Sequence, residues 1–409
     1  MNFIDLFAGA GGLSEGFKKA GFNPIAHVEL DNAACFTLKT RVAYHYLKNS
    51  NRLEEYYAYL KGEISRNELH KKIPEHLSAT VINAAIGTSN KKTFKQIDKL
   101  KGDKTVDFIV GGPPCQAYSY IGRAALKHKP EDPRKKLYIY YGHFLKKYSP
   151  NFFVFENVPG LKSSDDGKHY KNLVKYFKSI GYKIDDRLLN SYDFGVIQNR
   201  KRLIIIGWKE DIDFTYPEFE PLVHSWTRDD IFSDLPAIKH NHTERLSYYT
   251  TTEPNDYLRF SEIRNGVDFL SLHNTRPHNA EDLNIYRLAI KKLSNEGKRL
   301  KNDEIPLEER TQKNTTDFLD RFKVVDALPH TMIAHIAKDG HHFIHHDLEQ
   351  LRSISIREAA RIQSFPDDFY FEGVKENQNR TSAFKQIGNA VPPLMAFNIA
   401  TKIFNLLHV

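Results

Sequence analysis

The chain has 409 residues, of which 40% are hydrophobic, 27% charged and 12% aromatic. This composition is typical of a folded globular protein and excludes a disordered or fibrous chain, and the length favours two domains. The net charge of +8 is a weak indication of a polyanionic partner.

No segment predicts export, a membrane span or a disulfide framework. Asp5 interrupts the first apolar run, and the longest aliphatic run, 203–206, is far shorter than the roughly 20 residues that cross a bilayer. Two cysteines, Cys35 and Cys115, are too few for a disulfide framework or a cysteine-rich zinc site. We therefore expect a cytoplasmic protein that makes no membrane contact.

The first half of the chain predicts strands that alternate with helices. Apolar runs typical of buried strands occupy residues 2–7, 24–29, 106–112, 151–156 and 203–207. Amphipathic patterns predict helices after residue 12 and over 137–148 and 169–180. This alternation indicates an α/β fold with a doubly wound, mostly parallel sheet covered on both faces.

Two segments depart from the alternation. Residues 44–76 are rich in Tyr, Lys and Glu and predict a helical insertion outside the sheet. Residues 209–352 are polar, His-rich and without a clear period, which indicates a separate, irregular second domain. Helices return after residue 354, and we expect them to pack back against the first strand.

A glycine loop follows the first strand. A strand that runs into Gly9, Gly11 and Gly12 before a helix lets backbone amides approach a nucleotide-like ligand. No Gly-Lys-Ser/Thr follows, which argues against a triphosphate-binding loop. Glu29, at the end of the next strand, is placed to hold ribose hydroxyls. The alternative is a glycine turn without a ligand.

Cys115 follows two prolines and the 106–112 strand. Because Pro113 and Pro114 exclude a helix interior or a central strand, the thiol is expected on a rigid loop at a strand's carboxyl end, where ligand chemistry occurs in open α/β sheets. The alternative, a small buried hydrophobic side chain, does not explain the Pro-Pro-Cys-Gln context.

Charged groups end two other strands. Desolvation would raise the pKa of Glu156, so that it could donate a proton near neutral pH; the alternative is a structural salt bridge. Gln198, Arg200 and Arg202 are spaced by two and would share one face of an extended segment. They are candidates for clamping an anion or a carbonyl, or for an ordinary surface pair.

These elements, in this order, resemble the cytosine-5 DNA methyltransferase family of restriction-modification systems. The resemblance covers residues 1–208 and 353–409 and includes the blocks REAARIQSFPD (357–367) and KQIGNAVPP (385–393). It implies methyl transfer from S-adenosyl-L-methionine to carbon 5 of a cytosine that is rotated out of double-stranded DNA.

The resemblance also implies roles for single residues. Cys115 corresponds to the nucleophile that attacks carbon 6, and Glu156 to the glutamate that contacts ring nitrogen 3. Arg202 corresponds to the arginine at the base carbonyl, with Arg200 supporting the site. The residues implied for the cofactor pocket are Phe7, Gly9, Gly11, Gly12, Leu13, Glu29, Ile86, Asn389 and Val391.

The chain departs from the family next to the cofactor adenine. Relatives carry an acid before the isoleucine, whereas this chain has Ala85 before Ile86. Either Asn83 substitutes for that acid or the hydrogen bond is missing. A basic loop at 119–134 is expected to close over DNA.

The resemblance implies a methyltransferase fold in three segments. Residues 1–208 would form the catalytic and cofactor-binding domain, 209–352 a smaller target-recognition domain, and 353–409 the helices that complete the catalytic domain. We expect a monomer that acts on the same DNA site as a cognate restriction endonuclease, without a stable complex between them.

Two alternatives remain. A tRNA cytosine-5 methyltransferase of the same family would carry Cys-Phe-Thr in its middle segment, but that tripeptide occurs here at 35–37. A non-catalytic DNA-binding regulator would have no reason to keep both Cys115 and Glu156. We expect no metal site in the His-rich stretch 339–347, because it has no cysteine and no evident tetrahedral set.

Overall fold

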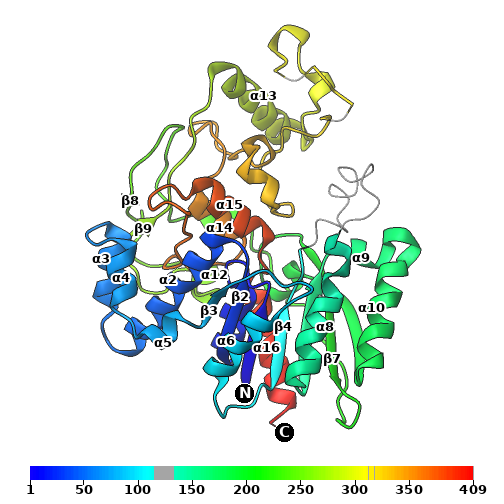
Figure 1. Ribbon diagram of the computed structural model, residues 1–409. Helices are drawn as coiled ribbons and strands as arrows, with labels where there is room; N and C mark the ends of the chain where they lie inside the picture. The colour runs from blue at the N-terminus through cyan, green and yellow to red at the C-terminus, as the bar shows by residue number, and fades with distance from the viewer. Residues whose placement is uncertain (115–132, 312, 317, 409) are drawn as a thin grey trace.

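The computed structural model describes residues 1–114, 133–311, 313–316 and 318–408, and it centres on a seven-stranded sheet (Figure 1). The strand order is β3-β2-β1-β4-β5-β7-β6. The bounds are β1 Asn2–Leu6, β2 Asn23–Glu29, β3 Val81–Asn83, β4 Phe108–Gly111, β5 Phe152–Asn157, β6 Tyr182–Asn190 and β7 Lys201–Lys209. Only β7 runs antiparallel to its neighbours β5 and β6, so the predicted doubly wound, mostly parallel sheet is confirmed.

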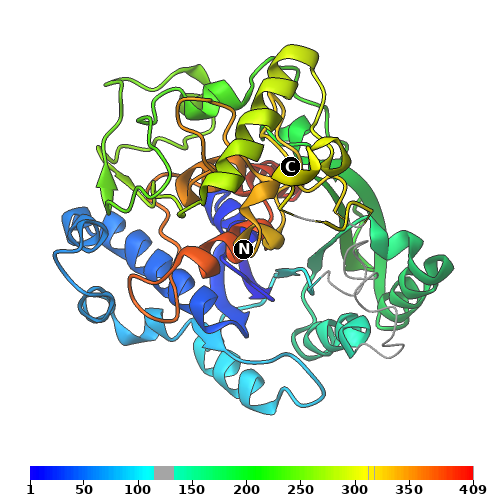
Figure 2. The same ribbon diagram turned by 90° about the horizontal axis from the view of Figure 1, so that it is seen from above.

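Helices cover both faces of this sheet (Figures 1 and 2). They are α1 Gly12–Lys19, α6 Lys91–Lys101, α8 Leu137–Tyr148, α9 Gly160–Ser163, α10 Lys168–Ser179 and α16 Pro393–Leu406. Along β1 the side chains alternate, so Phe3 packs in one core with Phe17 and Ile399, while Ile4 packs in another with Tyr141 and Phe177. The helices predicted over 137–148 and 169–180 are confirmed.

The predicted helical insertion is also confirmed and lies beside the sheet (blue, Figure 1). It consists of the end of α2 and of three short helices: α2 Asn32–Asn49, α3 Leu53–Lys61, α4 Arg66–Lys71 and α5 Glu75–Ser78. Tyr59 donates a hydrogen bond to Glu372 over 2.6 Å, and Tyr56 donates one to the Asp368 carbonyl over 2.6 Å. These buried polar contacts fasten the insertion to the segment that follows the REAAR block.

Residues 209–352, called the second region below, lie mostly above the sheet in Figure 1 and are largely irregular, as predicted. Its regular elements are α11 Arg228–Phe232, β8 Leu246–Ser247, α12 Asp256–Phe260, β9 Leu270–Ser271 and α13 Ala280–Glu296. The prediction of no periodic structure is wrong for α13, whose 17 residues begin at an Asn279 cap and bury Ile285, Tyr286, Ala289 and Ile290 on one face.

The C-terminal helices divide between two cores. The prediction that they pack back against the first strand holds for α16, which shares a core with Phe3. It is wrong for α14 (Ile356–Ile362) and α15 (Arg380–Asn389), because their apolar faces share a core with Ile231 and Met332 of the second region. These two helices therefore connect the second region to the sheet.

The chain remains on the sheet beyond the end of β7. The Tyr216 hydroxyl donates to the Ile204 carbonyl over 3.2 Å, and the rings of Phe214 and Phe152 lie 5.1 Å apart. A domain boundary at residue 209 stays a prediction. Among the described residues, no helix is long and apolar enough to cross a membrane.

Candidate active site

Several of the predicted catalytic and cofactor residues that the structure describes lie at one edge of the sheet. Strands β1, β2, β4 and β5 are parallel, so their carboxyl ends meet at the same edge, around the point where the strand order reverses between β1 and β4. Open α/β sheets bind their ligands at this position. The residues at this edge are the glycine loop, Glu29, Gly112 and Glu156.

The glycine loop is held in shape by Glu29. Phe7, Gly9 and Gly11 have positive φ values of 57°, 55° and 85°, which turn the chain sharply into α1. The Glu29 carboxylate accepts hydrogen bonds from the amides of Gly9 at 2.8 Å, Leu30 at 2.8 Å and Asp31 at 2.7 Å. Burial raises the pKa of Glu29, although these three bonds oppose the shift.

Gly12, Leu13 and Val391 contribute packing at this edge. A Cβ on Gly12 would lie 2.2 Å from the Val391 carbonyl oxygen, so the last sequence block approaches α1 at a distance that only glycine permits. The side chains of Leu13 and Val391 are buried in the core that α16 covers. Asn389 is exposed at the end of α15.

The predicted adenine region lies at the end of β3. Ile86 is buried and Ala85 exposed. The Asn83 amide nitrogen donates to the carbonyls of Glu29 at 3.2 Å and Leu30 at 2.9 Å. Leu30, which the sequence reading missed, keeps 66% of its surface exposed beside Glu29. Its position directly after Glu29, at the end of an apolar strand, is the signal in the sequence that could have identified it.

Glu156 and Arg202 form a nearly buried ion pair. Arg202 Nε lies 2.8 Å from Glu156 Oε1, and the two side chains are 10% and 13% exposed. Burial raises the pKa of Glu156, in the direction that its sequence context indicated, while Arg202 and Arg200 lower it. The carboxyl group is thus close to a cation and almost free of solvent.

The loop that leads to Cys115 begins against Glu156. A Cβ on Gly112 would lie 2.5 Å from Glu156 Oε2, and the Asn157 side chain donates to the Pro113 carbonyl over 3.2 Å. Cys115 and residues 119–132 of the predicted DNA loop lie outside the described residues. Asn157, which fixes the start of this loop, was not singled out by the sequence reading.

Arg200 and Arg202 point to different partners. The expectation that they share one face of an extended segment with Gln198 is wrong, because β7 begins at Lys201. The fully buried Arg200 guanidinium donates to the carbonyls of Gly388 at 3.1 Å and Ala390 at 2.8 Å. Gln198 accepts from the Met332 amide at 2.7 Å. This segment therefore joins the sheet to α15 and to the second region.

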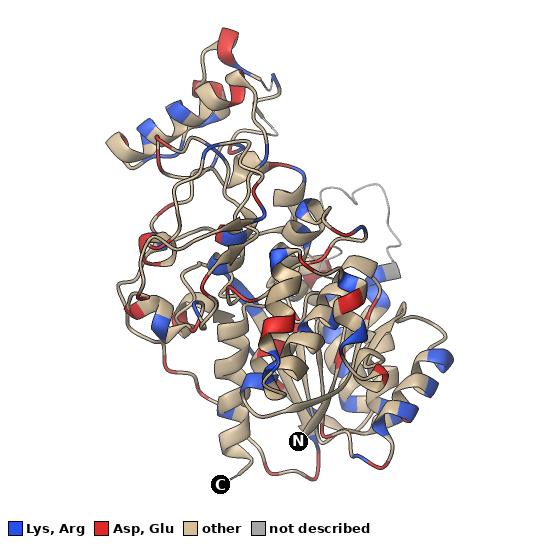
Figure 3. Ribbon diagram, turned by 90° about the vertical axis from the view of Figure 1, so that its left-hand side faces the viewer, with Lys and Arg blue, Asp and Glu red and all other residues tan. Residues whose placement is uncertain are grey.

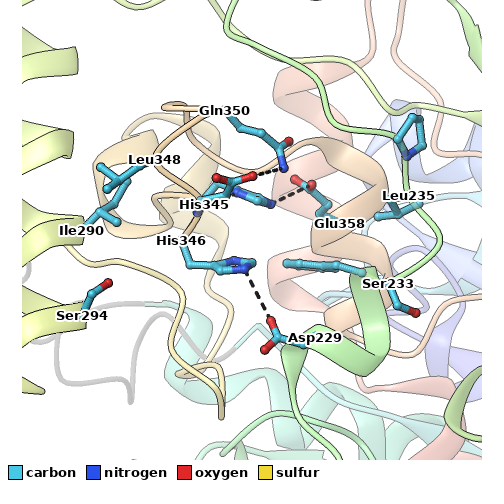
Figure 4. Close-up of a pocket in the computed structure, with 13 residues that line it drawn as sticks. Asp229, Ser233, Leu235, Ile290, Ser294, His345, His346, Leu348, Gln350 and Glu358 are labelled. Atoms are coloured by element: carbon cyan, nitrogen blue, oxygen red, sulfur yellow. Dashed lines mark hydrogen bonds and ion pairs between the residues drawn. The ribbon is translucent and has the colours of Figure 1, made fainter. Parts of the chain in front are cut away.

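A separate cavity of about 580 Å³ lies between α11, α13 and α14 (Figure 4). His345 Nε2 lies 3.5 Å from Glu358 Oε1, and His346 Nε2 lies 3.4 Å from Asp229 Oδ1. Among the described residues, none of those predicted for catalysis or cofactor binding lines this cavity. Lys and Arg are spread over both parts of the molecule and are not gathered on one element (Figure 3).

Comparison with known proteins identifies relatives along the whole chain. The family model of C-5 cytosine-specific DNA methylases matches residues 1–64 and 58–405. Type II methyltransferase M.Bpa9945I of Bacillus paralicheniformis is 41% identical and aligns over 100% of this chain and 99% of its own. Type II methyltransferase M1.HphI of Haemophilus parahaemolyticus is 30% identical over 99% of this chain and 87% of its own.

Two solved structures share the fold. A DNA modification methyltransferase encoded within an E. coli prophage aligns over 100% of both chains with a TM-score of 0.65 and 22% identity. The Entamoeba histolytica methyltransferase EhMeth aligns over 99% of this chain and 98% of its own, with a TM-score of 0.55 and 16% identity. The match to the family model and the 41% identity along the full length show that the chain belongs to the C-5 cytosine-specific DNA methylase family.

Proposed function

We propose that this DNA cytosine-5 methyltransferase moves a methyl group from S-adenosyl-L-methionine to carbon 5 of a flipped-out cytosine through a covalent bond to Cys115. The observation that carries the proposal is the contact of Gly112 with the Glu156–Arg202 pair. It supports a site in which the loop ending at Cys115 starts beside a buried acid and a fixed cation.

The residues at the glycine loop fit a nucleoside cofactor. A Cβ on Gly9 would meet no atom within 4 Å, so there is open space beside the loop, and the Glu29 carboxylate borders it through its bond to the Gly9 amide. Leu30 offers an apolar surface for a base. When bound, S-adenosyl-L-methionine supplies a methyl group on a sulfonium, a leaving group that is already activated.

Each of the proposed catalytic side chains has its own role in the reaction. The Cys115 thiolate adds to carbon 6 of cytosine, which makes carbon 5 nucleophilic toward the methyl group. Glu156 donates a proton or a hydrogen bond to ring nitrogen 3, and Arg202 binds the ring carbonyl while it holds Glu156. Loss of the proton from carbon 5 and breakage of the bond to Cys115 release the product. Arg200 supports this site by fixing Gly388 and Ala390.

The second region is proposed to choose the DNA site. Residues 209–352 are polar and irregular, and loops of this kind can place donors and acceptors against base edges in the major groove. The family supports sequence-specific action on DNA over the tRNA and regulator alternatives. The printed names of the relatives, as type II methyltransferases, support protection of the site against a cognate endonuclease.

A trapping experiment tests the proposal. Duplex DNA with 5-fluorocytosine at the target should form a denaturation-resistant complex with the protein in the presence of S-adenosyl-L-methionine, since fluorine cannot leave as a proton. Bisulfite sequencing of DNA from cells that express the chain identifies the target beforehand. Cys115→Ser should abolish trapping and methylation, because a hydroxyl is far less ionised than a thiol at neutral pH.

The other cysteine provides the matched control. Cys35 is buried, and its burial raises the pKa of the thiol to about 11, so it is a poor nucleophile at neutral pH. Cys35→Ala should still form the covalent complex at saturating cofactor. Trapping by Cys115→Ser, or its loss in Cys35→Ala alone, would overturn the assignment of the nucleophile.

A further inference from the structure

Three side chains with metal-binding atoms meet in the second region, and none of them is among the residues proposed for catalysis or cofactor binding. They are His335, Asp339 and His342, and one ligand atom of each lies within 4.8 Å of the others. His335 belongs to a 3-10 helix over Ala334–Ala337 and His342 to another over Gly340–His342. The two imidazole rings are perpendicular, with centroids 5.7 Å apart.

The backbone around these side chains is already fixed by hydrogen bonds. The His335 carbonyl accepts from the Asp339 amide at 2.9 Å. The Asp339 carboxylate accepts from the His341 amide at 3.0 Å, and His330 Nε2 donates to the His342 carbonyl at 2.8 Å. The three side chains therefore need little rearrangement to approach a common ion, which lowers the entropic cost of binding.

The guanidinium of Arg321 already pairs with one of the three proposed ligands. Arg321 Nε lies 3.2 Å from Asp339 Oδ2, so the guanidinium pairs with this carboxylate. The other oxygen, Asp339 Oδ1, accepts the hydrogen bond from the His341 amide. Both carboxylate oxygens therefore already have a partner, and a metal ion bound to Asp339 would share the carboxylate with Arg321. Arg321 and the ion are then expected to compete.

We propose that His335, Asp339 and His342 bind one divalent transition-metal ion of the Zn²⁺ class. Two imidazoles and one carboxylate suit Zn²⁺, whereas Mg²⁺ and Ca²⁺ prefer a shell of oxygen ligands. Three protein ligands leave a fourth tetrahedral position for water. The sequence of the stretch 339–347 did not indicate a metal site, because one of the three proposed ligands, His335, lies before that stretch.

The site would stabilise the chain next to the last sequence block. A Cβ on Gly388 of α15 would lie 2.3 Å from the Ala334 amide nitrogen, so the 3-10 helix that carries His335 is packed directly on α15. An ion that joins this helix to Asp339 and His342 would stiffen the part of the second region that packs on α15. The proposed methyl transfer needs no metal, so the role of the ion is structural.

Zinc titration of the full-length, untagged protein tests the proposal. We expect one tightly bound Zn²⁺ per chain in competition with a chelating indicator, and a melting temperature that rises with zinc because the ion binds the folded state. His335→Ala and His342→Ala should each weaken zinc binding at least about tenfold and remove the thermal shift. Arg321→Gln should tighten zinc binding, because it removes the competing cation.

His346→Ala is the matched control, since His346 lies in the same His-rich stretch but pairs with Asp229. It should bind zinc as the unmodified protein does. Equal zinc affinity in His335→Ala, His342→Ala and His346→Ala would mean that scattered surface histidines bind the ion, and would overturn the proposal. His335 is exposed, so His335→Ala decides the question if His342→Ala fails to fold.

Discussion

The side-chain amide of Asn157 donates a hydrogen bond to the main-chain carbonyl of Pro113 over 3.2 Å, and Asn157 is only 1% exposed. Asn157 directly follows Glu156 on β5, and Pro113 lies two residues before Cys115. The bond therefore ties the loop of the proposed nucleophile to the strand of the proposed acid, so that the two groups keep their relative position.

Asn157→Ala should slow methyl transfer in a single turnover by about tenfold or more. The substitution leaves the buried Pro113 carbonyl without its partner, which costs about 1–3 kcal/mol, and frees the loop that carries Cys115. Cofactor affinity, measured by calorimetry, should remain unchanged. Asn172→Ala, on the exposed face of α10, is the control. An unchanged single-turnover rate would show that the loop is positioned by other contacts.

Glu156→Gln should slow the chemical step by roughly a hundredfold, the scale of a positioned general acid. The amide keeps the size of the side chain but cannot supply a proton to ring nitrogen 3, and it loses the ion pair with Arg202. Single-turnover rates at saturating DNA and cofactor measure the effect, with the exposed Glu210→Gln as control. A rate within threefold of the unmodified protein would assign Glu156 a structural role.

Ala85→Asp should tighten S-adenosyl-L-methionine binding by about tenfold, because a hydrogen bond to a charged acceptor contributes about 1.5–3 kcal/mol. Ala85 is exposed at the end of β3. Asn83→Ala should loosen binding, since its amide holds the carbonyls of Glu29 and Leu30. Calorimetric titration measures both, and the exposed Thr88→Asp controls for added charge. No change beyond threefold would place the adenine contact elsewhere.

The stability of the fold should decrease below pH 6.5, in part through His45. Burial lowers the pKa of His45 from 6.5 to about 4, although Glu15 lies 3.1 Å from its Nε2. Between these values the unfolded chain binds a proton that the folded chain does not, so acidification favours unfolding. The loss from this group is at most about 1.4 kcal/mol for each pH unit.

Urea denaturation at pH 7 and pH 5 measures this effect. His45→Gln should have a smaller difference in free energy of unfolding between the two pH values than the unmodified protein. The exposed His76→Gln should retain the full difference. Identical pH dependence in all three proteins would mean that the pKa of His45 is the same in the folded and the unfolded chain.

Exchange of residues 220–331 with the corresponding segment of a relative should transfer the relative's DNA target. Phe214 and Tyr216 pack on the sheet, and Met332 is held by Gln198, so the exchange keeps the contacts at its two ends. Bisulfite sequencing of DNA from cells that express the chimera reads the site. A folded, active chimera that methylates the original site would place the specificity outside this segment.

The central strands were predictable because most residues of β1, β4 and β5 are buried and their sequences are mostly apolar. The edge strand β6 was missed, since YKIDDRLLN is half-exposed and carries charges. Helix α13 was missed because its apolar residues are spaced among lysines and polar side chains. In such segments, burial by distant parts of the chain decides the structure.

The sequence indicated which residues to consider for the site, but it did not indicate which side chains form ion pairs or hydrogen bonds with one another. Spacing by two made Arg200 and Arg202 candidates for one clamp, yet it is Arg202 that pairs with Glu156 at 2.8 Å. Arg200 instead donates to Ala390, which is 190 positions away along the chain. No local pattern indicates such a partner, because the contact exists only once α15 has packed.

The close approach of Gly12 to Val391 has a consequence for the order of synthesis. A chain that ends before residue 391 leaves Phe3 and Phe17 without the apolar face of α16 that covers them, and contacts between such distant segments form late in folding. On the ribosome, the glycine loop therefore acquires its packed neighbour only after the whole second region has been translated. A nascent chain thus completes the proposed cofactor pocket no earlier than the segment proposed to choose the DNA site.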